Sequence, residues 1–362
     1  MKDFRMILPN PASDTAGAAS MLFQLNGLTI IHDAAGSMES YITFDEEREL
    51  EGKRTVASRL SRLEAITGDD SILLHKIEEE CGDNPPPFVA ILGSPVPFTI
   101  GTDLDGIAAE AEFLTGVPSF AVNSGGFSLY DKGAGEALKQ VLHKTARAAA
   151  DRNESSVNLL GATPMDYSPA EIADLEEILL AKGAAIVNNL TMTDGMEQIY
   201  SAAEAAHNLV ISTSGLPAAR YLKQKYGTPY SNGIPFDGES NLTLTAPKKV
   251  LLIGESVFTK QLAKILLQNP DIEVTAGIIS NDDREIFPEI PSLLLHTEDD
   301  IRAELRKDYD SILGDPLYKE LLPQNSKCKF IERPHRALSG RLYPFSEYKL
   351  NHYLEKLKEC LK

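Results

Sequence analysis

Small and polar residues gather in three loops, each of which follows a short apolar stretch of the chain. The residues of interest are Gly36 and Ser37 in the first loop, Ser94, Gly101 and Asp103 in the second, and Gly125 and Gly126 in the third. Glycine lets a ligand approach the backbone closely, and the free amide groups at the start of a helix attract anions. Each loop alone is explained as an ordinary turn between a strand and a helix. In the second loop, Thr102 or Asp103 would cap the helix. Three such loops together favour a binding site.

A second group of reactive side chains lies near the C-terminus, after the strand-like segment 329–331. His335 stands in a loop with Arg333, Arg336 and Arg341. Histidine can transfer a proton or bind a metal, and arginine suits carboxylates and phosphates. Two interpretations stand side by side: a structural turn whose arginines pair with the acidic surface, or a loop that faces a ligand. In the second, His335 is a candidate metal ligand and the arginines favour an anionic ligand.

These loops need a framework, and the chain repeats a pattern of short apolar strand, small-residue turn and amphipathic helix. Strands are expected at 28–32, 88–92, 119–123, 157–161, 184–188, 208–212, 249–254 and 273–277. Helices are expected from 104 onward, after the Gly125-Gly126 turn to near 151, and at 169–182, 216–226, 257–268 and 348–361. Strands that alternate with helices predict parallel sheets, whose ligands bind beyond the carboxyl ends of the strands. The loops above leave their strands at that edge.

Clusters of Gly, Ser, Asn and Pro divide this pattern into three parts. The sequence predicts a first α/β domain with the cleft loops over residues 1–164, a second Rossmann-like domain over 165–246, and a third over 247–362 that includes a C-terminal helix.

The composition excludes several classes of protein. Of the 362 residues, 53 are acidic and 35 are basic, giving a net charge of −18, which disfavours binding to nucleic acid. No apolar stretch reaches the length of a membrane span, and the N-terminus does not resemble a signal peptide, so a cytoplasmic protein is expected. The three cysteines, Cys81, Cys328 and Cys360, are far apart and form no CxxC pair. Complete phosphate-loop and dinucleotide-binding motifs are absent.

Taken in order, five segments of the chain resemble the nitrogenase component 1 family, which includes nitrogenase subunits, a cofactor-assembly scaffold and tetrapyrrole reductases. The segments are 29–38, similar to a His-Gly-Pro-x-Gly-Cys turn; 63–77; 94–104, similar to Cys-Pro-x-x-x-Ile-Gly-Asp-Asp; 118–127, similar to a Pro-Gly-Phe turn; and 334–343, similar to a His…Ser-Gly-x-Tyr region near the metal cofactor. The resemblance implies three Rossmann-like domains, the third shortened, with a ligand cleft bounded by the loops near Ser37, Ser94, Gly125 and His335.

The chain departs from this family at the cysteines that bind the iron–sulfur cluster. The family's cysteines would fall at or near Ser37 and Ser94, with another near 14–17, and none of these is Cys. Because serine is a poor ligand for iron at neutral pH, the chain alone is not expected to hold the cluster.

The resemblance further implies a homodimer, or a heterodimer with a homologous subunit, that receives electrons from an ATP-dependent iron–sulfur reductase. The subunit would reduce or bind a small substrate, a metallocofactor or a tetrapyrrole-like ligand. Two alternatives remain open: a non-catalytic subunit that binds a ligand or metallocofactor beside a cysteine-bearing sister, and an unrelated α/β transferase.

Overall fold

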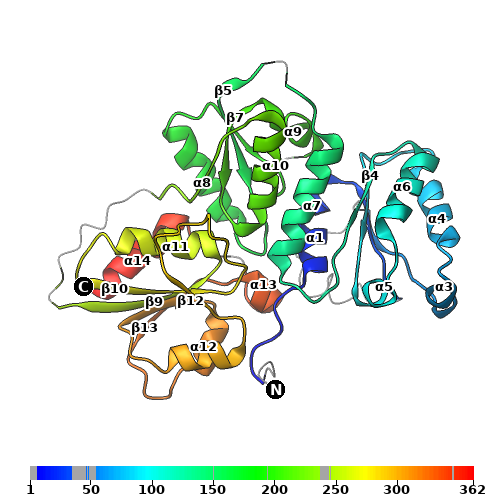
Figure 1. The fold of residues 1–362 in the computed structure, drawn as a ribbon. Coiled ribbons are helices and arrows are strands. Elements are labelled where there is room, and N and C mark those ends of the chain that lie inside the picture. Colours follow the sequence, from blue (N-terminus) through cyan, green and yellow to red (C-terminus); the bar gives the residue numbers. More distant parts are fainter. Residues whose placement is uncertain are drawn as a thin grey trace.

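A computed structural model describes residues 6–34, 46, 48, 54–149, 151–193, 195–236, 244, 246–344 and 346–362. The chain forms three α/β units, and all strand pairs in the described ranges are parallel (Figure 1). The structure therefore confirms the predicted fold class of repeated parallel-sheet domains.

The first unit has a four-stranded sheet in the order β2-β1-β3-β4. Its strands are β1 (Leu28–Ile31), β2 (Thr55–Ala57), β3 (Val89–Leu92) and β4 (Ser119–Val122). Its helices are α1 (Asp14–Leu22), α3 (Arg62–Thr67), α4 (Ser71–Cys81), α5 (Pro95–Ile100), α6 (Leu104–Thr115) and α7 (Tyr130–Thr145), with a 3-10 turn at Phe23–Leu25. The strands β1, β3 and β4 are fully buried, as their unbroken apolar runs predict.

The second unit has the strand order β6-β5-β7-β8. Its strands are β5 (Asn153–Leu160), β6 (Ile186–Asn189), β7 (Ala205–Val210) and β8 (Tyr230–Asn232), and its helices are α8 (Pro169–Ala181), α9 (Met196–Tyr200) and α10 (Leu216–Tyr226), with 3-10 turns at Ala202–Glu204 and Thr213–Gly215. β5 pairs with β6 and β7, so the second sheet begins at Asn153, whereas the first predicted domain runs to residue 164; the domain boundaries stay a prediction.

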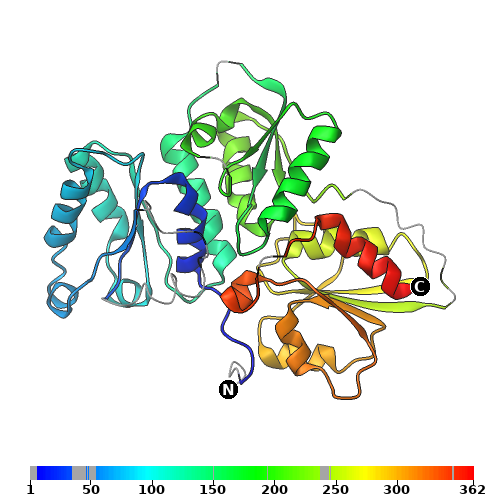
Figure 2. The ribbon, with the colours of Figure 1, turned by 180° about the vertical axis from the view of Figure 1, so that it is seen from behind.

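The third unit has a five-stranded sheet in the order β11-β10-β9-β12-β13. Its strands are β9 (Lys248–Gly254), β10 (Ile272–Ile278), β11 (Ser292–Leu294), β12 (Ser311–Gly314) and β13 (Lys329–Glu332). Its helices are α11 (Ser256–Leu266), α12 (Glu298–Leu305), α13 (Arg336–Ser339) and α14 (Leu350–Leu361), with 3-10 turns at Pro316–Leu321 and Gly340–Leu342. The C-terminal helix α14 covers one face of this sheet and also contacts α8 of the second unit (Figure 2).

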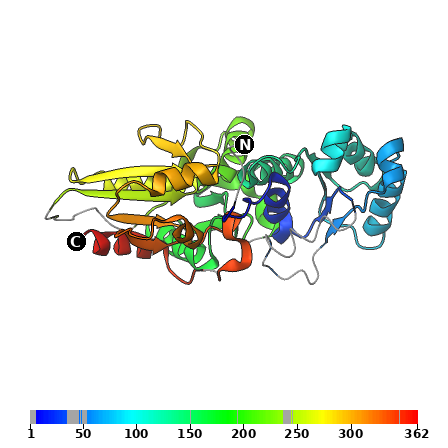
Figure 3. The ribbon, with the colours of Figure 1, turned by 90° about the horizontal axis from the view of Figure 1, so that it is seen from below.

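The three units are joined by a shared core. One cluster of buried apolar side chains extends from α1 and α7 through the second unit to α11 and α14. The first and third units lie at opposite ends of the view from below (Figure 3), and the second unit lies above both in the view of Figure 1. The long helix α7 joins the first unit to the second, because it packs against α1 on one side and against α10 on the other (Figure 1).

Glycines allow α1 and α7 to approach each other at backbone distance. A Cβ added at Gly17 would collide with the carbonyl oxygen of Tyr130, and a Cβ at Gly133 would collide with that of Asp14. Any larger residue would force the helices apart. This close contact fixes the first turns of α7, which project side chains toward the place where the three units meet.

Candidate functional site

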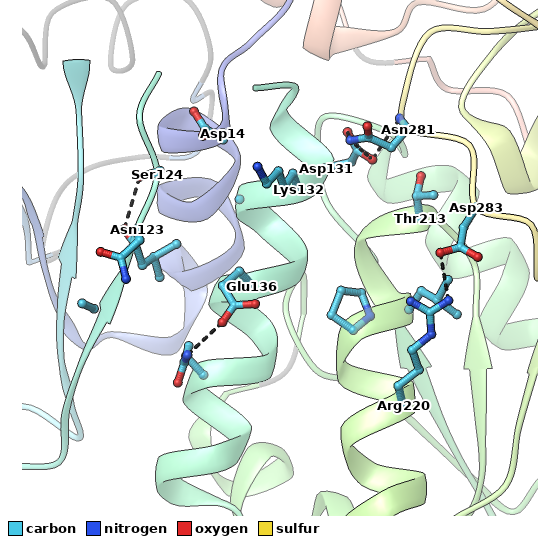
Figure 4. A pocket seen from close by; sticks show the side chains of 16 residues that line it. Asp14, Asn123, Ser124, Asp131, Lys132, Glu136, Thr213, Arg220, Asn281 and Asp283 are labelled. Atoms are coloured by element: carbon cyan, nitrogen blue, oxygen red, sulfur yellow. Dashed lines mark hydrogen bonds and ion pairs between the residues drawn. The ribbon is translucent and has the colours of Figure 1, made fainter. Parts of the chain in front are cut away.

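A cleft of about 430 Å³ opens where the three units meet, at the carboxyl ends of β4 and β10. Its walls are the end of β4, the first half of α7, the start of α10 and the loop after β10 (Figure 4). The polar and charged lining residues are Asp14, Asn123, Ser124, Asp131, Lys132, Glu136, Gln140, Thr213, Arg220, Asn281 and Asp283. This position matches the expectation that ligands of parallel sheets bind beyond the carboxyl ends of the strands.

Helix α7 supplies one wall through a row of side chains four residues apart. Residues four apart lie on one face of a helix, so Lys132, Glu136 and Gln140 all face the cleft. The Gln140 amide donates a hydrogen bond to Glu136 at 2.8 Å, and the ammonium of Lys132 lies 3.3 Å from the Ser128 hydroxyl. The Glu136 carboxylate is also paired with Lys139 at 3.2 Å, so the wall presents the Lys132 ammonium and a carboxylate already bound by protein groups.

The opposite wall carries an ion pair between the second and third units. The Arg220 guanidinium lies 2.8 Å from the Asp283 carboxylate and 3.1 Å from that of Glu285 (Figure 4). All three side chains are partly exposed, so the pair contributes little to stability. It does place a cation and a carboxylate at the cleft opening.

Asp131 joins the first unit to the third at the inner end of the cleft. Its carboxylate accepts hydrogen bonds from the Asn281 backbone N–H at 3.1 Å and from the Asn281 side-chain amide at 3.0 and 3.1 Å. Burial raises the pKa of this carboxyl to about 6, the bonds from Asn281 act in the opposite direction, and the nearby charge of Asp166 raises it further.

The predicted glycines Gly125 and Gly126 bind an internal carboxylate. Their backbone N–H groups donate to Asp14 at 3.1 and 2.7 Å. Gly126 has a φ of 74° and lies against the ring of Pro95, so both its conformation and its surroundings require glycine. The loop thus has the anion-binding geometry expected from the sequence, and the anion it holds belongs to α1.

The structure separates the remaining predicted residues of the first unit. The Ser94 hydroxyl is buried and donates to the His32 carbonyl at 2.8 Å. Gly101 ends α5 in a left-handed conformation, and Asp103 caps α6 by accepting from the Gly106 N–H at 3.0 Å. None of the three lines the cleft. Gly36 and Ser37 lie outside the described residues, and all these ligand-binding roles stay predictions.

His335 lies in a buried network at the junction of the units. Its Nε2 is 3.0 Å from the Asp166 carboxylate and 3.2 Å from the Tyr130 hydroxyl, while its backbone N–H donates to Asp315 at 2.7 Å. Only 3% of the residue is exposed. His335 borders a separate cavity of about 10 Å³ and not the 430 Å³ cleft. Its role as a metal ligand stays a prediction, and the observed contacts tie it to protein groups.

The neighbouring arginines also make contacts within the protein, and their role toward an anionic ligand stays a prediction. Arg333 is buried against Glu171, with Nε 2.9 Å from the carboxylate. Arg336 donates to the Tyr343 carbonyl at 2.7 Å. Arg341 donates to the Glu46 carbonyl.

The sequence analysis did not single out Lys132, Glu136, Arg220, Asn281 or Asp283. A helical spacing of charged residues directly after a Gly-Gly loop was the available signal for Lys132 and Glu136. Arg220 comes from the second unit, and Asn281 and Asp283 come from the third. Nothing local in the sequence places them opposite α7.

Comparison with known proteins identifies the family. The profile of the nitrogenase component 1 type oxidoreductases matches residues 13–285, which is most of the chain. The chain belongs to this family. Two curated relatives are nitrogenase iron-molybdenum cofactor biosynthesis proteins NifE. The protein from Bradyrhizobium diazoefficiens is 27% identical over 179 residues, covering 48% of this chain and 32% of the relative. That from Klebsiella pneumoniae is 26% identical over 175 residues, covering 44% and 37%. These matches span about a third of the relatives' length.

Solved nitrogenase structures share the fold of this nitrogenase component 1 type chain. The structure described as nitrogenase Cp1 at pH 6.5 has a TM-score of 0.72 and 12% identity, covering all of this chain and 94% of that one. Nitrogenase Cp1 at pH 5 has a TM-score of 0.67 and 14% identity, with coverage of 100% and 90%. At these identities the likeness shows the fold alone.

The cysteines of this family member lie away from the cleft. Cys81 is buried on α4, and Cys328 and Cys360 lie in the third unit beside β13 and on α14. No cysteine or histidine is among the cleft-lining residues, and no group of three or more His, Cys, Asp or Glu in the described ranges is arranged to hold a metal ion. Across the same ranges, no helix is both long and apolar enough to cross a membrane.

A second buried carboxyl, that of Glu255, connects the third unit to the cleft wall. It accepts from the Thr213 N–H and hydroxyl at 2.8 and 2.7 Å and from the Phe258 N–H at 3.1 Å. Complete burial, and then the charge of Asp166, raises its pKa from 4.5 to about 7 despite these donors.

The Glu255 carboxyl therefore makes folding stability depend on pH. The folded protein binds the Glu255 proton more tightly than the unfolded chain does. The contribution of this carboxyl to the free energy of unfolding is therefore complete below about pH 4.5 and is lost as the pH rises through 7. The side chain of Glu255→Gln cannot titrate. Between pH 4.5 and 7 its free energy of unfolding should therefore fall by roughly 3 kcal/mol less than that of the wild type, and its melting temperature should also fall less. Thermal unfolding across this range measures the effect. Glu154→Gln, at an exposed position, is the control; parallel pH profiles for Glu255→Gln and wild type would contradict the assignment.

Proposed function

We propose that this chain is a subunit of the nitrogenase component 1 type that binds a small polar ligand in the cleft between its three units. The cleft itself is the observation that carries the proposal. All three units contribute charged or hydrogen-bonding side chains to it, among them Lys132, Arg220 and Asn281. Its volume of about 430 Å³ lies within the range typical of small-molecule sites.

The lining residues suit some ligands better than others. They offer carboxylate, amide, hydroxyl, ammonium and guanidinium groups, which bind through hydrogen bonds and ion pairs. An iron–sulfur or related metallocluster needs thiolate or imidazole ligands, and these lining residues supply none, so they do not fit direct attachment of such a cluster. A substrate, or a cofactor held by polar groups at its edge, fits this set.

Two forms of this function are open. The name of the family supports an oxidoreductase subunit that reduces its bound ligand with electrons from an ATP-dependent iron–sulfur reductase. The match to cofactor biosynthesis proteins and the lack of cysteine in the cleft support a non-catalytic subunit that holds a substrate or cofactor for a homologous partner. Family membership leaves the unrelated transferase without support. A cytoplasmic location is part of the proposal, in line with three free cysteines.

Filling the cleft with a large side chain tests the ligand-binding proposal. Gln140 is half-buried on the α7 wall, so Gln140→Trp should block the cleft with little loss of stability. The protein is purified without oxygen from cells that also express its genomic neighbours, and bound small molecules are weighed by native mass spectrometry. We expect the wild type to carry a ligand and Gln140→Trp to lose at least nine-tenths of it.

Gln224→Trp is the matched control, because Gln224 is exposed on α10 and does not line the cleft. This variant should retain the ligand. A wild-type protein without any bound molecule, or a Gln140→Trp variant that keeps it, would contradict the proposal.

We further propose that the chain forms a homodimer, or a heterodimer with a homologous subunit, through the carboxyl edge of the first sheet. An apolar patch lies there on α5 and in the loop after β4, consisting of Val96, Phe98, Ile100 and Phe127. Phe98 and Phe127 are 62% and 71% exposed, and their ring centroids are 5.8 Å apart. A contiguous exposed apolar patch is typical of a protein interface.

A charge in this patch should disrupt the dimer. Phe98→Asp would place a carboxylate in an apolar contact, which raises the dissociation constant by about tenfold or more. Phe113→Asp is the control, because Phe113 is also highly exposed but lies at the end of α6, outside the patch. Sedimentation analysis, with and without the homologous subunit, measures the mass. Equal masses for Phe98→Asp and wild type would rule out this interface.

A further inference from the structure

From the arrangement of Asp131 at the inner end of the cleft, we infer that this residue carries a proton and gives it to the bound ligand. The inference rests on the proposed function, since it assigns a role within the same cleft. It also narrows the ligand class, because the ligand must present a basic nitrogen or oxygen to Asp131.

The geometry places the Asp131 carboxyl between the cleft and the third unit. The residue lies in the first turn of α7, is 3% exposed, and lines the cleft. Asn281 donates to both of its oxygens, which holds the carboxyl plane in one orientation (Figure 4). A carboxyl oxygen has two acceptor positions, so the positions that Asn281 leaves open remain for a proton and for a ligand in the cleft.

The charges around Asp131 leave it without a paired cation. In the described part of the chain, Asp131 forms no ion pair: the guanidinium of Arg220 is bound to Asp283 and Glu285, and the ammonium of Lys132 lies beside Ser128. The titratable groups of the surrounding elements are Asp14 of α1, Tyr130, Lys132 and Glu136 of α7, Asp166 after β5, Arg220 of α10, and Glu255, Lys260 with its ion-pair partner Asp282, Asp283 and His335 of the third unit. Most of them are acidic. A buried carboxyl among acids favours its protonated form.

The proton transfer is balanced without a further reactant. The O–H bond of Asp131 breaks, its electron pair stays on the carboxylate, and the proton forms a new N–H or O–H bond on the ligand. The two donor groups of Asn281 stabilise the carboxylate that results. Water entering through the cleft opening restores the proton. Asn281 is thus a positioning residue, which sets how readily Asp131 releases its proton.

Carbon-13 NMR of the full-length protein labelled at the aspartate carboxyl carbons tests this role without a ligand. The signal that disappears in Asp131→Asn identifies Asp131. We expect it to titrate with a midpoint near 6 in the wild type. In Asn281→Ala, which removes the side-chain donor, the midpoint should rise by about one pH unit. A midpoint below 4.5, or the same midpoint in Asn281→Ala and wild type, would overturn the inference.

Chemical labelling tests whether the Asp131 proton can be reached from the cleft. A water-soluble carbodiimide with glycinamide attacks protonated carboxyl groups, and mass spectrometry locates the product. We expect labelling of Asp131 at pH 5 that decreases at least fivefold at pH 8 and is blocked in Gln140→Trp. Asp174, which is buried outside the cleft, is the control and should stay unlabelled. If Asp131 is as unreactive as Asp174, the inference is wrong. If the cleft binds no ligand, the proposed function fails, but the NMR titration and the labelling of Asp131 are unchanged.

Discussion

The buried side chain of Asp166 is a polar contact point shared by all three units, within the apolar core that joins them. It follows β5 in the second unit and contacts the Tyr130 hydroxyl of the first unit and the His335 imidazole of the third. Arg333 of the third unit adds a bond to the Asp166 carbonyl at 2.7 Å. Burying a carboxylate is costly unless its oxygens are hydrogen-bonded, so each of these partners must be present. These contacts orient each unit relative to the other two. The cleft depends on this orientation, because all three units line it.

Other buried carboxylates repeat this arrangement at the boundaries between units. Asp131 binds Asn281, Glu255 binds Thr213, and Glu171 binds Arg333, each across a boundary. Such contacts are directional, so they specify one relative orientation more sharply than apolar contacts alone. Burial at these boundaries raises the pKa of Asp131 and of Glu255, which links the way the units are assembled to the chemistry that the cleft can perform.

The sequence predicts the framework well because its signals are local. The fully apolar strands β3 and β4, and the glycine-rich loop after β4, follow directly from short stretches of residues. β2 escapes prediction because it is a three-residue edge strand without an apolar run. The predicted boundary at 164 follows a cluster of turn residues after β5 that looks like a linker, whereas strand pairing joins β5 to the second sheet. Gly125 was singled out by its type, but its partner Asp14 lies 111 residues away in the sequence. His335 was likewise singled out by its type, and its contact with Asp166 could come only from the tertiary structure.

The contacts of Asp166 join the three units into one cooperative structure. Calorimetric unfolding of Asp166→Ala tests this coupling directly. The substitution removes the carboxylate that the Tyr130 hydroxyl and the His335 Nε2 share and leaves these two buried groups only their mutual contact at 3.2 Å, at a cost of about 1–3 kcal/mol. Asp151→Ala, at an exposed site, is the control. We predict one transition for the wild type and for Asp151→Ala, and for Asp166→Ala a lower first transition that separates from the rest. A single transition for Asp166→Ala at the wild-type temperature would contradict the account.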